Sequence, residues 1–271
     1  MKKKTAKKAA GIVVDLGNTS LRMALYMDGK IVERYDRVKQ KDEIREHVVQ
    51  TFISKVEHYK KIAVINGIAI ASVANPSHTD SAIKFFQTYF QGLPVRVISG
   101  DMKGLSVKLA RGFTQKKKIG ADRLANAMAA VALGKHPCVI ADFGTALTVD
   151  GVNERGEFVG GMILPGMTTL LRAMHDYTAQ LPELDLPPKP FEKPFGQNTK
   201  DAMLAGVEHG YRGLACGAVA TLQNALGGKC TLLATGGMAK RVATTSGLNF
   251  EINPDLTLLG IAQVLHTGVS S

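Results

Sequence analysis

Two acidic turns, set at a fixed distance inside matching hydrophobic patterns, constrain the fold of this chain more than any other feature. The apolar run Gly-Ile-Val-Val leads into Asp15, and the apolar run Cys-Val-Ile-Ala leads into Asp142, 127 positions later. The same offset separates the glycines of the turns that follow: Gly17 and Gly144, Gly29 and Gly156. Three equal offsets predict a duplicated three-stranded unit, with one copy in each of two lobes.

The residues after each acidic turn continue the pattern of a meander. Residues 21–26 alternate apolar and polar side chains, and the Asp-Gly dipeptide at 28–29 predicts a tight turn before a third strand over 31–35. In the second copy, strands are predicted over 147–152 and 157–162. The remaining strands are predicted over 62–73, 95–99 and 231–235, and helices over 41–59, 77–90, 121–133, 167–173, 199–226 and 255–266. The long stretch 199–226 is expected to be interrupted or tightly packed at its glycines, Gly206, Gly210, Gly213 and Gly217. Residues 181–194 contain five prolines and predict an extended loop.

Composition agrees with a buried-sheet α/β protein. Of 271 residues, 45% are hydrophobic but only 6% are aromatic, and there is no Trp. The length suits one large domain or two lobes. Cys138, Cys216 and Cys230 lie in apolar contexts and are expected to be small buried side chains in a reducing compartment. Neither a CxxC pair nor a His pair at i, i+4 occurs, so the sequence does not favour a zinc site.

The charge of the chain is concentrated at its start. The net charge is +11, and five lysines lie within the first ten residues, which carry no acid. We expect residues 1–10 to be a disordered basic tail; a weak anchor for nucleic acid is the alternative. Since no apolar run of 18 residues occurs, we expect a cytoplasmic protein with no membrane partner.

The acidic turns suit phosphate chemistry. Glycine lets backbone N–H groups approach a phosphate, and Thr adds a hydroxyl donor. The Asp of each turn repels phosphate and therefore works through a cation or a Mg²⁺-bound water. Two such turns facing across a cleft would hold a polyphosphate, whereas one alone is adequately explained as a tight hairpin. Neither the GxxxxGK[ST] nor the GxGxxG phosphate-binding motif is present.

Phosphoryl transfer also needs a carboxylate to take the proton of the acceptor hydroxyl. The sequence Gly-Ala-Asp-Arg at 120–123 supplies Asp122 as the candidate base, with favourable charge at a helix N-terminus as the alternative. Arg123 suits a carboxylate or phosphate of the substrate, and an ordinary exposed Arg is the alternative.

Taken in order, these motifs resemble the type III pantothenate kinase family. They are Asp15-Leu-Gly-Asn-Thr, Gly120-Ala-Asp-Arg, Asp142-Phe-Gly-Thr-Ala, Gly160-Gly-Met-Ile-Leu-Pro-Gly, Asn198-Thr199 and Thr235-Gly-Gly, and the likeness runs from about residue 11 to about residue 266. The resemblance implies an α/β, two-lobed, duplicated ribonuclease H-like/actin-like fold with a nucleotide cleft between the lobes. We expect lobes over 11–119 and 120–271.

The resemblance also implies roles for individual residues. The first phosphate loop and one later Thr would bind ATP: Asp15, Leu16, Gly17, Asn18, Thr19, Ser20, Leu21, Arg22 and Thr145. Pantothenate would contact Phe113, Gly120, Ala121, Asp122, Arg123 and Thr199, with Asp122 as catalytic base; helix capping is the alternative for Thr199. Asp15 would act on Mg²⁺ through water, and Asp142 would hold a monovalent cation, K⁺ or NH₄⁺. The family is dimeric and makes 4′-phosphopantothenate, the first committed intermediate towards coenzyme A.

The chain departs from the family pattern at several positions. Phe113 and Lys116 stand where members often carry Tyr and Pro, and Leu147 stands where Thr is frequent. Two alternatives to a pantothenate kinase stay open at this stage. One is another phosphotransferase or phosphohydrolase of the same superfamily; the other is a non-enzymatic nucleotide-binding regulator.

Overall fold

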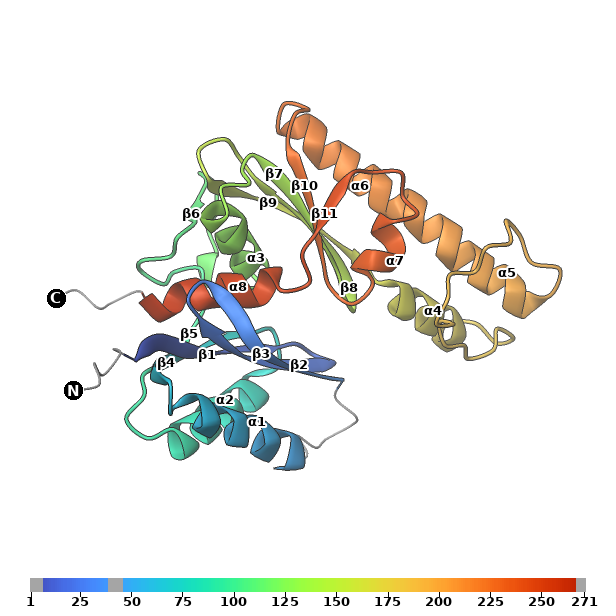
Figure 1. Cartoon of the computed structure of the whole chain (residues 1–271). Coiled ribbons are helices and arrows are strands. Elements are labelled where there is room, and N and C mark those ends of the chain that lie inside the picture. Colours follow the sequence, from blue (N-terminus) through green and yellow to red (C-terminus); the bar gives the residue numbers. More distant parts are fainter. Residues whose placement is uncertain (1–6, 39–45, 267–271) are drawn as a thin grey trace, which may run out of the picture. The chain divides into compact units, whose positions relative to one another are not determined.

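The computed structural model describes residues 7–38 and 46–266, which form two compact units (Figure 1). The first unit comprises Met1–Gly134 with Asp255–Ser271, and the second comprises Lys135–Pro254. This division differs from the expected boundary at 119/120, because residues 120–134 and the C-terminal segment belong to the first unit. The expected tail of residues 1–10 also ends earlier than predicted, because the first strand begins at Lys8. Residues 1–6 lie outside the described residues.

The sheet of the first unit has the strand order β3-β2-β1-β4-β5. Its strands are β1 (Lys8–Leu16), β2 (Ser20–Met27), β3 (Lys30–Val38), β4 (Ala63–Ser72) and β5 (Val95–Val97). The first three form the predicted antiparallel meander, and β4 and β5 run parallel to β1. Asp28 and Gly29 both have positive φ, as the tight turn between β2 and β3 requires.

Helices cover both faces of this sheet. On one face lie α1 (Glu46–Tyr59) and α2 (Pro76–Tyr89); on the other lie α3 (Ala121–Ala132) and α8 (Leu256–Ala262), followed by a 3₁₀ turn, Gln263–His266 (Figure 1). Because β1 is central, its residues Ile12, Val13 and Val14 are fully buried. Phe52 and Val56 of α1 are buried as the amphipathic pattern predicts. Residues 41–45 of that predicted helix lie outside the described residues.

The second unit repeats the same sheet order, as β9-β8-β7-β10-β11. Its strands are β7 (Cys138–Phe143), β8 (Ala146–Val152), β9 (Glu157–Pro165), β10 (Thr231–Thr235) and β11 (Phe250–Ile252). Again the first three form an antiparallel meander, and β10 and β11 are parallel to β7. The duplication inferred from the equal offsets is therefore confirmed at the level of topology. The turns differ by one residue, because Leu16 pairs with Leu21 whereas Phe143 pairs with Leu147.

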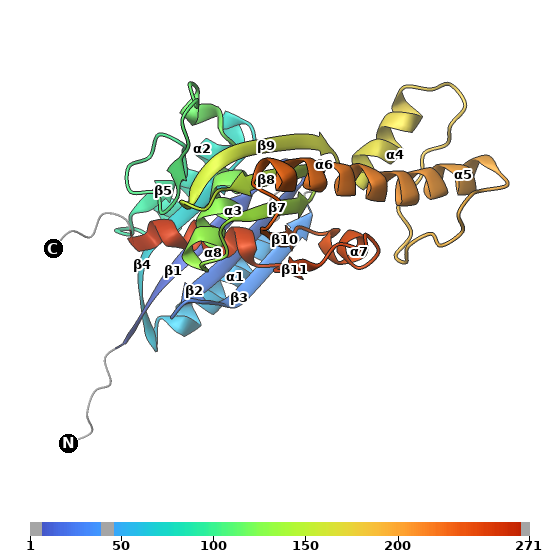
Figure 2. The same ribbon diagram turned by 90° about the horizontal axis from the view of Figure 1, so that it is seen from above.

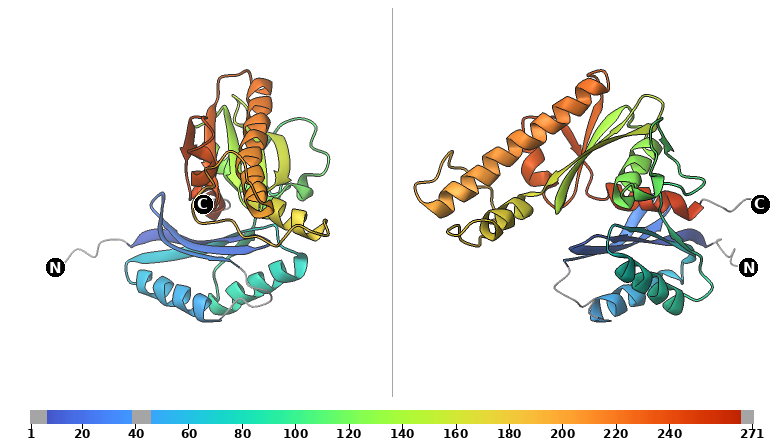
Figure 3. Two further views of the ribbon diagram at one scale, coloured as in Figure 1. Left: turned by 90° about the vertical axis from the view of Figure 1, so that its right-hand side faces the viewer. Right: turned by 180° about the vertical axis from the view of Figure 1, so that it is seen from behind.

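The helices of the second unit are α4 (Met167–Asp176), α5 (Thr199–Ala205), α6 (Tyr211–Ala225) and α7 (Ala239–Ala243). Helix α6 packs against the sheet and lies along β7 and β8. Helix α5 continues through a π-helical turn, Gly206–Gly210, into α6, so that one rod extends past the sheet (Figures 2 and 3). The interruption predicted within 199–226 is this π-turn. Tight packing at the four glycines was wrong, because a Cβ built on any of them meets no neighbour within 4 Å.

Short elements were not anticipated from the sequence. They are β6 (Lys108–Leu109), the 3₁₀ turn Lys116–Lys118, α7 and β11. Among the described residues, none of the helices has the length and apolarity needed to cross a membrane. The three cysteines are free. Cys138 is buried as expected, and burial raises its pKa to about 12, whereas Cys216 and Cys230 are only partly buried.

Candidate functional site

The first acidic turn lies between β1 and β2 in the first unit. The Gly17 amide donates to the carbonyl of Ser20 at 2.9 Å, which closes the turn and leaves the side chains of Asn18 and Thr19 exposed. The antiparallel register then places Asp15 directly opposite Arg22. The turn therefore offers glycine backbone and a hydroxyl to solvent, while its acidic residue faces a guanidinium.

Asp15 is held in a nearly buried ion pair. Its carboxylate is 6% exposed, and the Arg22 Nε donates to its Oδ2 at 2.8 Å, with Nη2 contacting the same oxygen. That Nη2 also lies 3.4 Å from the hydroxyl of Thr257 at the start of α8. Charge-assisted hydrogen bonds of this kind fix both side chains. Arg22 is therefore part of the acidic turn's own structure as well as a candidate phosphate ligand.

Asp122 stands at the start of α3, in the same unit. Its Oδ1 accepts the Arg123 amide at 2.7 Å, so the expected stabilisation of the helix start is present. Gly120 precedes it, and a Cβ at that position would lie 2.7 Å from the same Oδ1. Burial raises the pKa of Asp122, and the negative charge of Asp15 raises it further. The two carboxylates therefore lie close enough to interact, and a raised pKa brings Asp122 towards the range of a general base.

The Lys-rich segment before α3 has part of its positive charge paired with an acidic residue. Lys116–Lys118 form a 3₁₀ turn, and Lys117 Nζ lies 3.3 Å from Asp101. A hydrogen bond from Ser99, with the Lys117 charge as a further cause, holds the pKa of Asp101 below its usual value. Phe113 is half-buried in the preceding loop, where its ring is retained without a phenolic donor.

The second acidic turn lies between β7 and β8 in the second unit, and neighbouring segments brace it. The carbonyl of Thr145 accepts the amide of Gly166 at 3.0 Å and the hydroxyl of Thr169 at 2.6 Å, both from the start of α4. A Cβ on Gly166 would lie 2.4 Å from the Gly144 carbonyl oxygen. The Gly-Gly-Met-Ile-Leu-Pro-Gly motif therefore serves to bring α4 against this turn.

The segment after β10 closes on the same turn. Asp142 pairs with Thr235 in the parallel ladder, and the Met238 amide donates to the Phe143 carbonyl at 3.0 Å. Gly236 has φ of +91°, and a Cβ there would lie 2.5 Å from Oδ1 of Asp142. Three motifs that are distant in sequence thus meet around Asp142. Burial, with a contribution from the Asp142 charge, raises the pKa of Tyr211 well above its usual range, which keeps the phenol neutral.

Thr199 is the first residue of α5, so helix capping, the alternative to its expected role in binding pantothenate, is wrong. The cap is Asn198, whose Oδ1 accepts the Asp201 amide at 2.9 Å. The predicted site residues are divided between the two units. Asp15–Arg22 and Asp122–Arg123 are in the first unit, and Asp142, Thr145 and Thr199 are in the second.

Two features of the site escaped the sequence analysis. The Asp15–Arg22 ion pair follows from the cross-strand register, and counting across the four-residue turn would have predicted it. The contact of Arg22 with Thr257 joins residues 235 positions apart, and no local pattern signals it. Among the described residues, no cluster of three His, Cys, Asp or Glu side chains is suited to hold a metal ion.

Duplicated sheets, each with an acidic turn after its first strand, place this chain among the actin-like α/β proteins. A conserved Baf family protein from Campylobacter jejuni has the same fold at a TM-score of 0.56, with 18% identity over 94% of this chain and 96% of that one. The activator of 2-hydroxyisocaproyl-CoA dehydratase from Clostridium difficile matches at a TM-score of 0.51, with 10% identity over 95% of this chain and 94% of that one. At these identities the likeness establishes the fold.

Sequence comparison gives the family. The profile of type III pantothenate kinase matches residues 11–221. Proteins named type III pantothenate kinase from Dehalococcoides mccartyi and Bacillus cytotoxicus are 32% and 33% identical to this chain, each over 92% of it and 93% of the relative. A relative of the same name from Halalkalibacterium halodurans is 30% identical over 95% of this chain and 99% of its own length. The chain belongs to the type III pantothenate kinase family.

Proposed function

We propose that this protein transfers the γ-phosphoryl group of ATP to the primary hydroxyl of pantothenate. The product is 4′-phosphopantothenate, the first committed intermediate of coenzyme A synthesis. The observation that carries the proposal is the juxtaposition of Asp122, whose pKa is raised, with the Asp15–Arg22 pair at the first phosphate turn. Membership of the family supplies the substrate.

The proposed reaction forms one bond to phosphorus, breaks another and moves one proton, and residues of this chain are assigned to these steps. The pantothenate hydroxyl oxygen bonds to the γ-phosphorus, the bond to the β,γ-bridging oxygen breaks, and ADP leaves. Asp122 takes the hydroxyl proton at the carboxylate oxygen opposite the one that accepts the Arg123 amide. We assign the carboxylate of pantothenate to Arg123, because a guanidinium matches that group in charge and geometry. Phe113, Gly120, Ala121 and Thr199 are proposed to line the substrate pocket.

The nucleotide phosphates are assigned to the two acidic turns. Residues 15–22 supply backbone amides, the Thr19 and Ser20 hydroxyls and Arg22, and Thr145 contributes from the second turn. We propose that each turn binds phosphate oxygens in the same manner, because the two turns occupy equivalent places in their sheets. Neutralising the phosphate charge is the main catalytic task in reactions of this type.

Two cations complete the proposed site. Asp15 already accepts two guanidinium nitrogens on one oxygen, so we assign its action on Mg²⁺ to a bridging water, in keeping with the preference of Mg²⁺ for a hydrated shell. Asp142 suits a monovalent cation, because its carboxylate lies among turn backbone where only glycine fits at 236. When bound, such cations would neutralise negative charge on the phosphates. We further propose a cytoplasmic homodimer, on the family likeness.

The test measures ADP release by the purified full chain with MgATP, with and without pantothenate, in K⁺ and in Na⁺ buffer. We expect release to depend on pantothenate, to be faster in K⁺, and to yield phosphopantothenate by mass spectrometry. ADP release that ignores pantothenate but responds to another alcohol would instead identify a different phosphotransferase.

A further inference from the structure

The edge of β4 is open over half of its length. On one side, β1 pairs with β4 from Ala63 to Ser72. On the other side, β5 pairs only with Ile68–Ile70, so within the described residues no strand adjoins 63–67 there. A row of unpaired backbone groups at a sheet edge is a template for an additional strand. Five residues span about 16 Å, enough for a short extended peptide.

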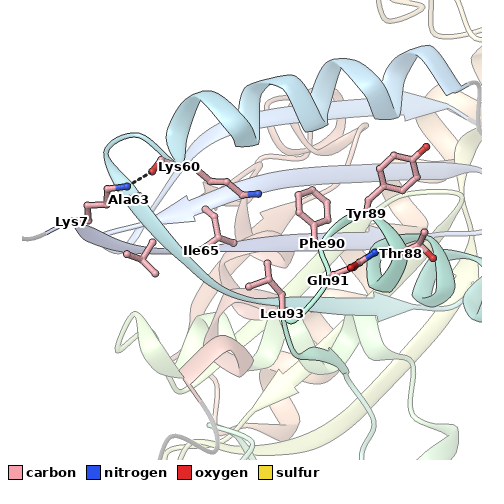
Figure 4. Close-up of a pocket in the computed structure, with 10 residues that line it drawn as sticks. Lys7, Lys60, Ala63, Ile65, Thr88, Tyr89, Phe90, Gln91 and Leu93 are labelled. Carbon is pink, nitrogen blue, oxygen red and sulfur yellow. Dashed lines mark hydrogen bonds between the residues drawn. The ribbon is translucent and has the colours of Figure 1, made fainter.

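A groove of about 520 Å³ lies along this open segment (Figure 4). Its floor is apolar and comes from β4 and from the end of α2 with the loop that follows: Ala63, Ile65, Phe90 and Leu93. Figure 4 shows these side chains between Lys7 at one end and Tyr89 and Thr88 at the other. Val64, which alternates with Ala63 and Ile65 along the strand and also lines the groove, is 51% exposed, and Ile62, just before the strand, is 54% exposed. An added strand would therefore find apolar surface for the side chains on both of its faces.

The charged side chains that line the groove are both lysines. Lys7 and Lys60 line it, no acidic side chain does, and exposed Lys61 adjoins it. Lys60 is already held, with its Nζ 2.5 Å from Glu57 and 5.6 Å from the centre of the Phe90 ring. Lys7 donates to the Lys60 carbonyl at 2.7 Å, and no described carboxylate pairs with Lys7 or Lys61. Uncompensated lysines beside a strand edge favour an acidic partner.

From these observations we infer that the 63–67 edge of β4 is a docking site for an extended, acidic segment of a partner protein, added as a strand beside β4. Alternate side chains of the segment occupy the apolar groove, and its carboxylates face Lys7 and Lys61. This surface shares no residue with the proposed catalytic machinery. The docking inference can therefore be tested independently of the proposed kinase activity.

The probe is a fluorescein-labelled heptapeptide of alternating acidic residues and valine, titrated with the full chain by fluorescence anisotropy. We expect saturable binding that weakens as salt is raised. The double variant Lys7→Glu, Lys61→Glu should weaken binding at least about tenfold. The matched control Lys84→Glu, an exposed lysine of α2 outside the groove, should stay within about twofold of wild type. All three proteins should retain equal pantothenate-dependent ADP release.

A second peptide separates strand addition from simple charge attraction. Methylation of alternate backbone nitrogens removes the hydrogen-bond donors of one edge and keeps the charge and the side chains. We expect this peptide not to bind. The inference would be overturned if the two peptides bound equally well, or if binding of the first did not saturate up to about 1 mM protein. It would also be overturned if the chain associated with itself and Val64→Lys abolished that association, because the edge would then bind a second copy of the chain.

Discussion

Replacing Asp122 with Asn tests the proposed base with the smallest change in shape. The amide oxygen can still accept the Arg123 N–H at the position now 2.7 Å away, so the start of α3 is preserved. What is lost is the ability to take a proton. General-base assistance contributes about 10²–10⁴ in rate, which corresponds to about 2.7–5.4 kcal/mol in activation free energy. We expect kcat to fall by this factor while the affinity for ATP changes little.

The assay compares single-turnover formation of phosphopantothenate with equilibrium binding of a fluorescent ATP analogue. Asp101→Asn is the matched control, because it removes an exposed carboxylate from the same unit. A variant at Asp122 with near-wild-type kcat would refute the base assignment. Equal loss of nucleotide binding and of turnover would show that the substitution disturbs the phosphate turn instead.

The raised pKa of Asp122 also gives a stability prediction. In the folded state, burial and Asp15 favour the protonated carboxyl, so its pKa lies above the ordinary 3.8. Between that value and the folded pKa, the folded chain holds a proton that the unfolded chain has released, and stability falls as pH rises. Asp122→Asn removes this penalty. We expect its Tm to exceed that of wild type at neutral pH, with the difference closing near pH 4; an Asn variant less stable at neutral pH would contradict the assignment.

Three further outcomes are expected. Arg241→Met should lower the free energy of unfolding by about 3–5 kcal/mol, because it leaves the buried Glu208, 4% exposed, without the guanidinium that now lies 2.6 Å away. Denaturant unfolding measures this change, and a loss below about 1 kcal/mol would contradict the prediction. Gly260→Ala should destabilise by about 1–3 kcal/mol or more, since the new Cβ would lie 1.7 Å from the Ala125 carbonyl oxygen, whereas Gly213→Ala, with open space around it, should be neutral or stabilising. Phe113→Tyr should lower the KM for pantothenate several-fold with kcat unchanged, since one hydrogen bond contributes about 0.5–1.5 kcal/mol; an unchanged KM would remove position 113 from the pocket.

Much of the fold follows from the sequence because its strands carry strong periodic signals. The duplicated meander was predictable from equal offsets, and both copies of the sheet have the same strand order. The residues of β11 and α7 were not anticipated, because three- and five-residue elements are too short to show a period. Their conformation depends on packing against β10 and on Gly236, which are tertiary features.

The candidate site, like the fold, was predictable from the sequence only in part. The identity of Asp122 follows from a motif, but its raised pKa does not, because desolvation and the nearby Asp15 charge arise only after folding. The C-terminal helix was predicted, yet its membership of the first unit was not. Gly260 explains that membership, since its lack of a side chain allows α8 to approach the backbone of α3 closely.

The two acidic turns have diverged in the residue that lies opposite each Asp across the hairpin. Opposite Asp15 in the ladder stands Arg22, whereas opposite Asp142 stands the uncharged Thr148. The charge of Asp15 is therefore matched within the protein, which agrees with the proposal that it acts on Mg²⁺ only through water. The cross-strand neighbour of Asp142 is thus uncharged, and a side chain at Gly236 would collide with its carboxylate. The duplicated hairpin thus sets a guanidinium opposite one Asp and a hydroxyl-bearing residue opposite the other, and this difference is the reason why we propose different cation roles for Asp15 and Asp142.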